Sequence, residues 1–127
     1  VAAYASVSIE TSVPSADPHR LILLLFEGAK ISIAAAKLHM TQGNISEKGS
    51  AISKAIDIIT NGLKASLDYE AGGDLAVKLG ALYDYMAHRL LWANLKNDAA
   101  ALDEVLSLLN ELHGAWEQIA PGNEQAA

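Results

Sequence analysis

The sequence predicts an all-α fold, an antiparallel up-down bundle of four main helices. Apolar residues recur every three or four positions in four stretches of similar length, which is the spacing of one buried helix face. Short breaks rich in Gly, Asn and Asp separate the stretches, so neighbouring helices should run antiparallel. A chain of 127 residues suits one domain. We expect a bundle over residues 17–120, an extended or short helical lid segment before it over 1–16, and a disordered tail after it over 121–127.

The first predicted helix has the clearest boundaries. Asp17 can accept from the free N–H groups of the first turn, and Pro18 has no N–H to lose at the first helical position. Gly43 then ends the helix. Ser46 is the expected cap of the second helix, a glycine pair at 72 and 73 precedes the third, and an Asn-Asp break precedes the fourth. The predicted helices cover residues 18–41, 46–68, 74–96 and 99–119.

The third predicted helix carries two apolar faces rather than one. Tyr83 falls on the stripe expected to face the core, but four apolar side chains lie away from that stripe: Tyr85, Leu91, Trp92 and Leu95. A groove for a partner and a homodimer seam both explain such a surface. The composition leaves a similar choice, because 51% hydrophobic and only 19% charged residues imply either a partner surface or many alanines at close helix contacts.

In the fourth predicted helix, the stripe that includes Leu109, Leu112, Trp116 and Ile119 is expected to face inward.

The sequence carries no pattern typical of a catalytic or metal site. It has no Cys, which excludes a disulfide framework, a zinc-thiolate site and a Cys nucleophile. No Glu is followed three positions later by His, as a di-iron helical bundle requires. Asp84 and His88 have the spacing of an ordinary polar pair on a helix. We therefore predict a protein that is not an enzyme and has no metal and no cofactor, with its four histidines exposed or half-buried.

Charge and hydropathy point away from nucleic acids and membranes. The formal net charge is −6 and the sequence pI is about 5.0, without a cluster of Lys and Arg that could follow phosphates. The longest run of large apolar residues, at 21–26, is far shorter than the ~18–20 residues that span a bilayer. The N-terminal residues lack the basic-then-apolar order of a signal peptide. We predict a cytoplasmic protein that does not insert into the membrane.

Several segments follow one another along the chain: ADPHRLI at 16–22, LFEGA at 25–29, LDYEAGGDLA at 67–76, LYDYMAHRL at 82–90, and the pairs Ala93-Asn94 and Ala115-Trp116. In this order and spacing they resemble the FliS-type flagellar secretion chaperones, which bind newly made flagellin. The resemblance covers nearly the whole chain, over residues 4–116. The chain departs from the family pattern at Asp17, where Ser is frequent, at Glu27, where Asp is usual, and at His88, where Arg is common. None of these removes an apolar groove residue.

The resemblance implies a function and partners. The chain would bind the C-terminal region of flagellin, which is disordered when free, prevent its premature polymerisation, and deliver it to the membrane export gate of the flagellar type III apparatus. The N-terminal segment in the family can cover an apolar groove until the client displaces it. Val1 and Tyr4 match the apolar and aromatic positions of that segment, and Val7 and Ile9 continue it.

The expected site combines these lid residues with apolar positions of the second and third helices. As a chaperone the protein would be a monomer or a weak homodimer. The alternative is a structural bundle that uses its extra apolar surface for homodimerisation. The predicted client-binding and lid residues are Val1, Tyr4, Val7, Ile9, Ile52, Ile56, Ile59, Leu63, Leu75, Leu79, Leu82, Tyr85 and Trp92.

Overall fold

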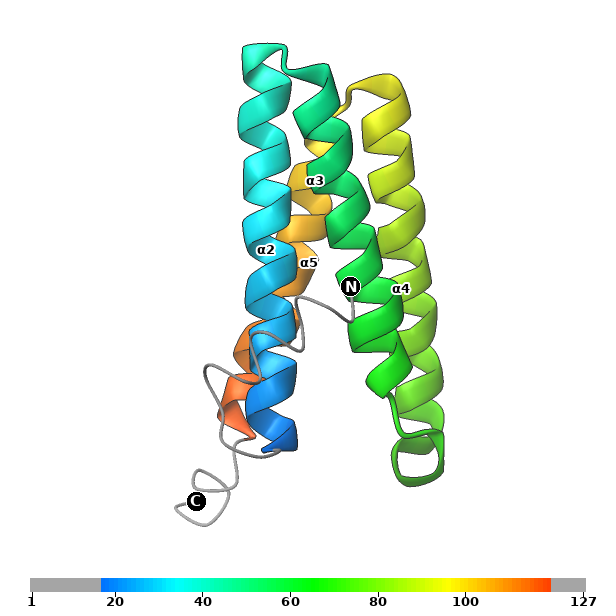
Figure 1. Cartoon of the computed structure of the whole chain (residues 1–127). Helices are drawn as coiled ribbons and strands as arrows, with labels where there is room; N and C mark the ends of the chain where they lie inside the picture. Colours follow the sequence, from blue (N-terminus) through cyan, green and yellow to red (C-terminus); the bar gives the residue numbers. More distant parts are fainter. Residues whose placement is uncertain (1–16, 120–127) are drawn as a thin grey trace.

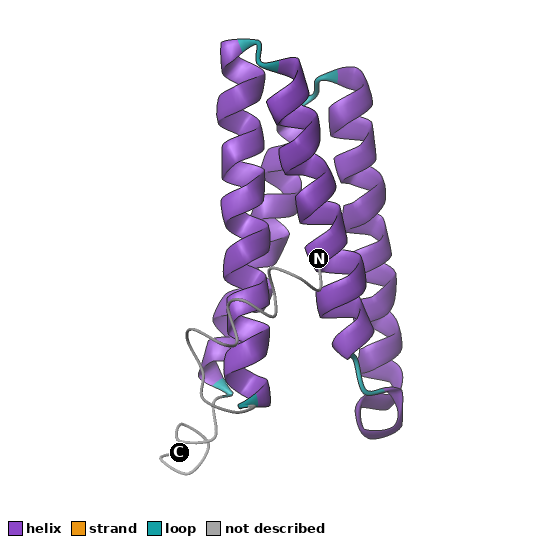
Figure 2. Ribbon diagram, in the orientation of Figure 1, coloured by secondary structure: helices purple, strands orange, loops and turns teal. Residues whose placement is uncertain are grey.

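The computed structural model describes residues 17–119, which form four antiparallel helical rods joined by short loops (Figures 1 and 2). The second rod is continuous but changes its helix type twice, from α-helix to a π-helix, η1, and then to a 3₁₀ turn, η2. The predicted lid at 1–16 and tail at 121–127 lie outside the described residues. The elements are α2 (Pro18–Gln42), α3 (Ile45–Asp57), η1 (Ile58–Leu63), η2 (Lys64–Ser66), α4 (Tyr69–Lys96) and α5 (Ala99–Gln118).

Each rod packs mainly on two neighbours. α2 packs on α3 and α5, and α4 packs on the same two rods from the opposite side of the bundle. Helices that follow one another along the chain therefore lie side by side, and α5 closes the bundle against α2 (Figure 1). The predicted all-α antiparallel bundle is confirmed. Within residues 17–119, no helix combines the length and the apolar character needed to cross a membrane.

The predicted boundaries of the first helix are confirmed by its end groups. Asp17 is the N-cap, and its carboxylate accepts from the backbone N–H of Arg20 at 3.3 Å, with Pro18 at the first helical position. At the other end Gly43 adopts φ 75, the left-handed conformation that closes a helix, and its N–H donates to the carbonyl of Met40.

The start of the second helix was predicted wrongly. It begins at Ile45, one residue before the expected cap Ser46, and the residue before it, Asn44, makes no side-chain capping bond to the helix. The side chain of Asn44 donates instead to Gln42 Oε1 at 3.2 Å. The rod ends at Ser66 rather than 68, because Leu67 has an extended backbone.

The predicted break at the glycine pair is confirmed. Asp68 caps a first helical turn by accepting from Glu70 N at 3.1 Å and Ala71 N at 3.0 Å. Gly73 then has a non-helical backbone, with φ 51 and ψ −128, and the long part of α4 follows it. Residues with a side chain rarely adopt that φ, so Gly73 permits the bend between the first turn and the long remainder of α4.

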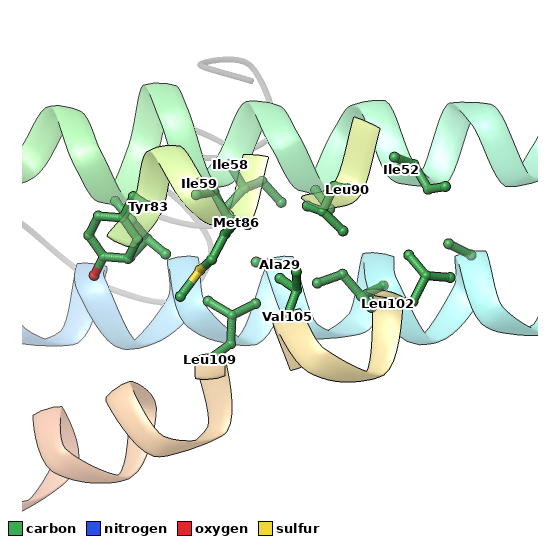
Figure 3. Close-up of a cluster of buried hydrophobic side chains, with 14 of the residues drawn as sticks. Ala29, Ile52, Ile58, Ile59, Tyr83, Met86, Leu90, Leu102, Val105 and Leu109 are labelled. Carbon is green, nitrogen blue, oxygen red and sulfur yellow. The ribbon is translucent and has the colours of Figure 1, made fainter. Parts of the chain in front are cut away.

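The core lies along the centre of the bundle and is built from all four rods (Figure 3). Val105, Met86 and Leu90 are fully buried there, and burial raises the pKa of Tyr83 to about 12. Small side chains let the rods approach closely. Buried alanines therefore account for part of the high hydrophobic content of the sequence. The buried alanines among the described residues are Ala29, Ala36, Ala55, Ala76, Ala93 and Ala101.

Three polar or charged residues are buried among residues 17–119: Ser32, Lys48 and His113. Lys48 is 4% exposed, and its ammonium donates to Asn94 O at 3.1 Å and to Asn97 Oδ1 at 3.0 Å. It thereby satisfies carbonyl groups at the C-terminal end of α4, where a cation is favoured by the helix dipole. His113 is also buried, contrary to the predicted exposed or half-buried state. Its Nδ1 accepts from Lys30 Nζ at 2.9 Å, which joins α5 to α2.

The first turn of α2 is fastened to the last turn of α5. The indole Nε1 of Trp116 donates to His19 O at 3.0 Å, and His19 Nε2 donates to Trp116 O at 2.7 Å. The two rings are stacked with centroids 5.0 Å apart. Trp116 and Leu112 are only half-buried, and Ile119 is 48% exposed beyond the end of α5. The inward stripe predicted for this helix is therefore wrong at Ile119, because the helix ends before it.

Candidate interaction surface

The exposed apolar side chains of the bundle are concentrated on one helix. Eleven large apolar residues are exposed among the described residues, and seven of them belong to α4. Scattered single apolar residues are normal on a protein surface, but a concentration on one helix indicates a contact surface. Five of them share one arc of the long part of α4, and we call these the α4 apolar face: Val77, Tyr85, Leu91, Trp92 and Leu95. Leu75 lies roughly on the opposite side of the helix from Leu91 and Leu95, and Tyr69 precedes the kink at Gly73.

A groove between the second rod and α4 adjoins this face. It has a volume of about 600 Å³, and Leu91 belongs both to the groove and to the α4 apolar face. Ile56, which is half-buried, is the other apolar lining residue. The rim is polar and consists of Ser53, Lys54, Asp57, Thr60 and Asn61.

The rim of the groove carries little net charge. Its two ionisable residues, Lys54 and Asp57, have opposite signs, and the others are neutral hydrogen-bonding residues. Desolvation acts to raise the pKa of Asp57, but a hydrogen bond donated by Asn61 acts to lower it, and the resulting pKa is below its ordinary value. Asp57 therefore stays ionised near neutral pH. An apolar floor with such a rim suits an amphipathic partner without a strong charge.

Two aromatic residues of the α4 apolar face are held in place by α5. The hydroxyl of Tyr85 donates to Glu104, which also accepts from Arg89 Nε at 2.7 Å. Trp92 Nε1 donates to Asp98 Oδ2 at 3.1 Å. The polar atoms of both aromatics are thus occupied, while the residues remain 43% and 46% exposed. Fixed aromatic rings beside Arg are typical of the residues that dominate binding energy, because little side-chain entropy is lost on contact.

Glu104 links these side chains electrostatically. The hydrogen bonds from Tyr85 and Arg89 lower the pKa of Glu104 below its ordinary value of 4.5, because they stabilise the carboxylate. The hydrogen bond between Tyr85 and Glu104 also raises the pKa of Tyr85. Glu104 therefore anchors both groups as an anion at neutral pH.

The structure separates the predicted site residues into several groups. Ile52, Ile59 and Leu63 are 1%, 0% and 2% exposed and form part of the core, so they do not line a surface in the folded bundle. The stripe of the second rod that contains these three residues faces the core, and the groove is lined instead by the predicted residue Ile56.

The other predicted positions lie on the surface, at the edge of the core, or outside residues 17–119. Tyr85 and Trp92 belong to the α4 apolar face, and Leu75 is exposed elsewhere on α4. Leu79 and Leu82 are half-buried and pack against the core. The four lid residues lie outside the described part of the chain: Val1, Tyr4, Val7 and Ile9.

The predicted site omitted Leu91 and Leu95, although both are exposed on α4, at 55% and 78%. The available signal was their position away from the core stripe, the same signal that singled out Trp92. The groove rim gave no sequence signal, because its polar residues look like any solvent-facing helix surface.

Asp84, which the sequence places one helical turn from His88, has its ion pair with another part of the bundle. Asp84 Oδ1 accepts from Lys64 Nζ at 2.8 Å, which ties α4 to η2 rather than to His88 on the same helix. Over residues 17–119, no three His, Asp or Glu side chains come together in a group that could hold a metal ion.

Comparison with known proteins identifies the family. The chain matches the family described as flagellar protein FliS over residues 1–123. It is 54% identical over 121 residues to the flagellar secretion chaperone FliS of Salmonella typhimurium, covering 95% of this chain and 90% of that protein. It is 49% identical over 117 residues to the flagellar secretion chaperone FliSB of Pseudomonas aeruginosa, covering 92% of each. It is 44% identical over 116 residues to FliS of Escherichia coli, covering 91% of this chain and 85% of that protein. The resemblance seen in the motifs is confirmed, and this chain belongs to the FliS family of flagellar secretion chaperones.

Proposed function

We propose that this protein is a cytoplasmic, non-catalytic export chaperone that binds the disordered C-terminal region of newly made flagellin. Binding prevents premature polymerisation, and the complex is then delivered to the membrane gate of the flagellar type III export apparatus. The observation that carries the binding site is the concentration of exposed apolar side chains on α4, beside the groove that shares Leu91. Family membership supports the choice of a flagellar client.

The physical demands of such a client agree with this surface. A disordered segment that folds on binding gives up about 2–5 kcal/mol or more in ordering, which a large apolar contact has to offset. The α4 apolar face runs along a helix of 28 residues. A client helix can lie beside α4 and place apolar side chains over Leu91 and Trp92, while its polar face stays in water.

Calorimetric titration with a flagellin C-terminal peptide tests this proposal. Leu91→Glu should weaken binding by about tenfold or more, because it puts a charge at the shared edge of the groove and the α4 apolar face. Leu38→Glu is the matched control, since Leu38 is also a leucine that is 55% exposed but lies on α2. Its effect should stay within about threefold. Equal losses for the two variants, or no binding by the unmodified protein, would refute the proposed site.

The lid remains a prediction that the same peptide can test. If Tyr4 covers the apolar surface in the free protein, Tyr4→Ala should increase the fluorescence of a dye that binds exposed apolar surface, with little change in helix content. It should also tighten peptide binding, because the client no longer competes with the lid. Unchanged dye fluorescence would mean that the segment does not shield this surface.

Homodimerisation is the competing use of the same surface. Light scattering across a range of protein concentrations distinguishes the two, because an obligate dimer built on the α4 apolar face leaves no surface for a client. A stable dimer that dissociates with Leu91→Glu but not with Leu38→Glu would favour the structural alternative.

A further inference from the structure

The second rod contains a wide turn that its sequence pattern does not require. α3 ends at Asp57, and η1 continues as a π-helix over Ile58–Leu63. There the N–H of Lys64 donates to the carbonyl of Ile59, five residues earlier, before η2 tightens into a 3₁₀ turn. A π turn amounts to one extra residue inserted into an α-helix, and such turns are rare and concentrate at functional sites.

The inner side of the wide turn is tightly packed against α2. A Cβ placed on Gly62 would lie 3.0 Å from Leu25 Cδ2, so only glycine fits this approach without movement. Ile58 also packs against α2, where a Cβ on Gly28 would make an ordinary contact of 3.4 Å with Ile58 Cδ1. The change from π to 3₁₀ geometry is supported by Ser66, whose hydroxyl donates to Gly62 O at 2.6 Å.

The outer side of the same turn forms one wall of the groove. Thr60 and Asn61 belong to η1, and Asp57 immediately precedes it. These three residues complete the polar rim beside Ile56 and Leu91. We infer that the π turn is a positioning element, in which the extra residue pushes the wall outward and sets the shape of the groove that receives the client helix. This inference rests on the proposed function.

The extra residue of the π turn can be removed without removing the buried residues on either side of it. The turn begins and ends with buried adjacent pairs, Ile58 with Ile59 and Gly62 with Leu63. Deleting Asn61, which is exposed, removes one residue between these pairs and allows the rod to continue as an α-helix. Each pair can still face α2, whereas the groove wall loses its outward bulge. The deletion therefore changes the groove more than the core.

The test compares the unmodified protein with the Asn61 deletion and with Asn61→Ala, which removes the side chain but keeps the extra residue. Each is titrated with the flagellin C-terminal peptide, and helix content is followed by circular dichroism. We expect the deletion to keep its helix content and lose about tenfold or more in affinity, and to lose clearly more than Asn61→Ala, whose own loss measures what the rim side chain contributes. A deletion variant that binds as tightly as the unmodified protein overturns the inference and leaves the proposed function intact.

If the deletion variant fails to fold, hydrogen exchange of the unmodified protein tests whether the client contacts the π turn. Bound peptide should slow exchange of the amides over residues 58–66 by about fivefold or more, with little effect over 46–51 at the other end of the same rod. Equal protection of the two segments, or none, overturns the inference. If the unmodified protein binds no flagellin peptide at all, the proposed function fails first, and the role assigned to the π turn fails with it.

Discussion

Replacing the buried Lys48 by Met tests whether its two hydrogen bonds stabilise the bundle. Lys48→Met keeps the apolar stem but removes the donor to Asn94 O and Asn97 Oδ1. Hydrogen bonds from a charged donor contribute about 1.5–3 kcal/mol each, and the charge at the C-terminal end of α4 adds up to about 1 kcal/mol. Two effects reduce this loss. Burying Met does not require removing an ammonium group from water, and Asn97 is exposed enough to bind water instead. We expect a net loss of about 2 kcal/mol in the free energy of unfolding.

Urea unfolding followed by circular dichroism measures this change. With a slope of about 1–3 kcal/mol per molar urea, the midpoint should fall by about 1 M without a change in slope. Lys78→Met is the control, because Lys78 is exposed on the same helix that Lys48 contacts, and its effect should stay within about 0.5 kcal/mol. If the two variants are equally stable, the hydrogen bonds of Lys48 only compensate for burying its charge, and the reasoning is wrong.

Three further changes probe the contacts of α5. Asp98→Ala should lower stability by about 1 kcal/mol through loss of the helix cap, and a red shift in the emission of Trp92 should report the loss of its hydrogen bond. Trp116→Phe should also cost about 1 kcal/mol in thermal unfolding, because it removes the donor to His19 O, and no change would mean that stacking alone joins these ends. Glu104 has a lowered pKa in the folded protein, so its contribution to stability is present above pH 4.5 and is lost as the pH falls through the folded pKa. Glu104→Gln should therefore flatten the decline in stability at acidic pH, and an unchanged pH profile would contradict the assignment.

The features predicted from sequence are those set by local chemistry. Asp17 and Gly43 mark helix ends through their own hydrogen bonding and backbone freedom, so neighbouring residues suffice to find them. The exposed positions Leu91 and Leu95 were visible as apolar residues off the core stripe. Periodicity alone did not reveal whether the stripe containing Ile52 faces the core or a groove, because that depends on where the neighbouring rods lie.

The features missed from sequence depend on contacts between distant residues. The π turn is held by the approach of Gly62 to Leu25, which are far apart in the chain. From the sequence alone, Lys48 would be expected to face solvent. Only the folded structure places Asn97, at the end of α4, beside it. The glycine pair correctly signals a break at Gly73, but it gives no sign of the extra helical turn that Asp68 caps before the break.

The hydrogen bond between Lys30 and His113 has a consequence for the alignment of α5 along α2. A slide of one turn would move His113 by about 5.4 Å and leave the Lys30 ammonium without its acceptor. The stacking of Phe26 on His113, with ring centroids 5.5 Å apart, would be lost in the same step. These two contacts therefore favour one axial alignment of α5 on α2, the alignment in which the first turn of α2 bonds to the last turn of α5.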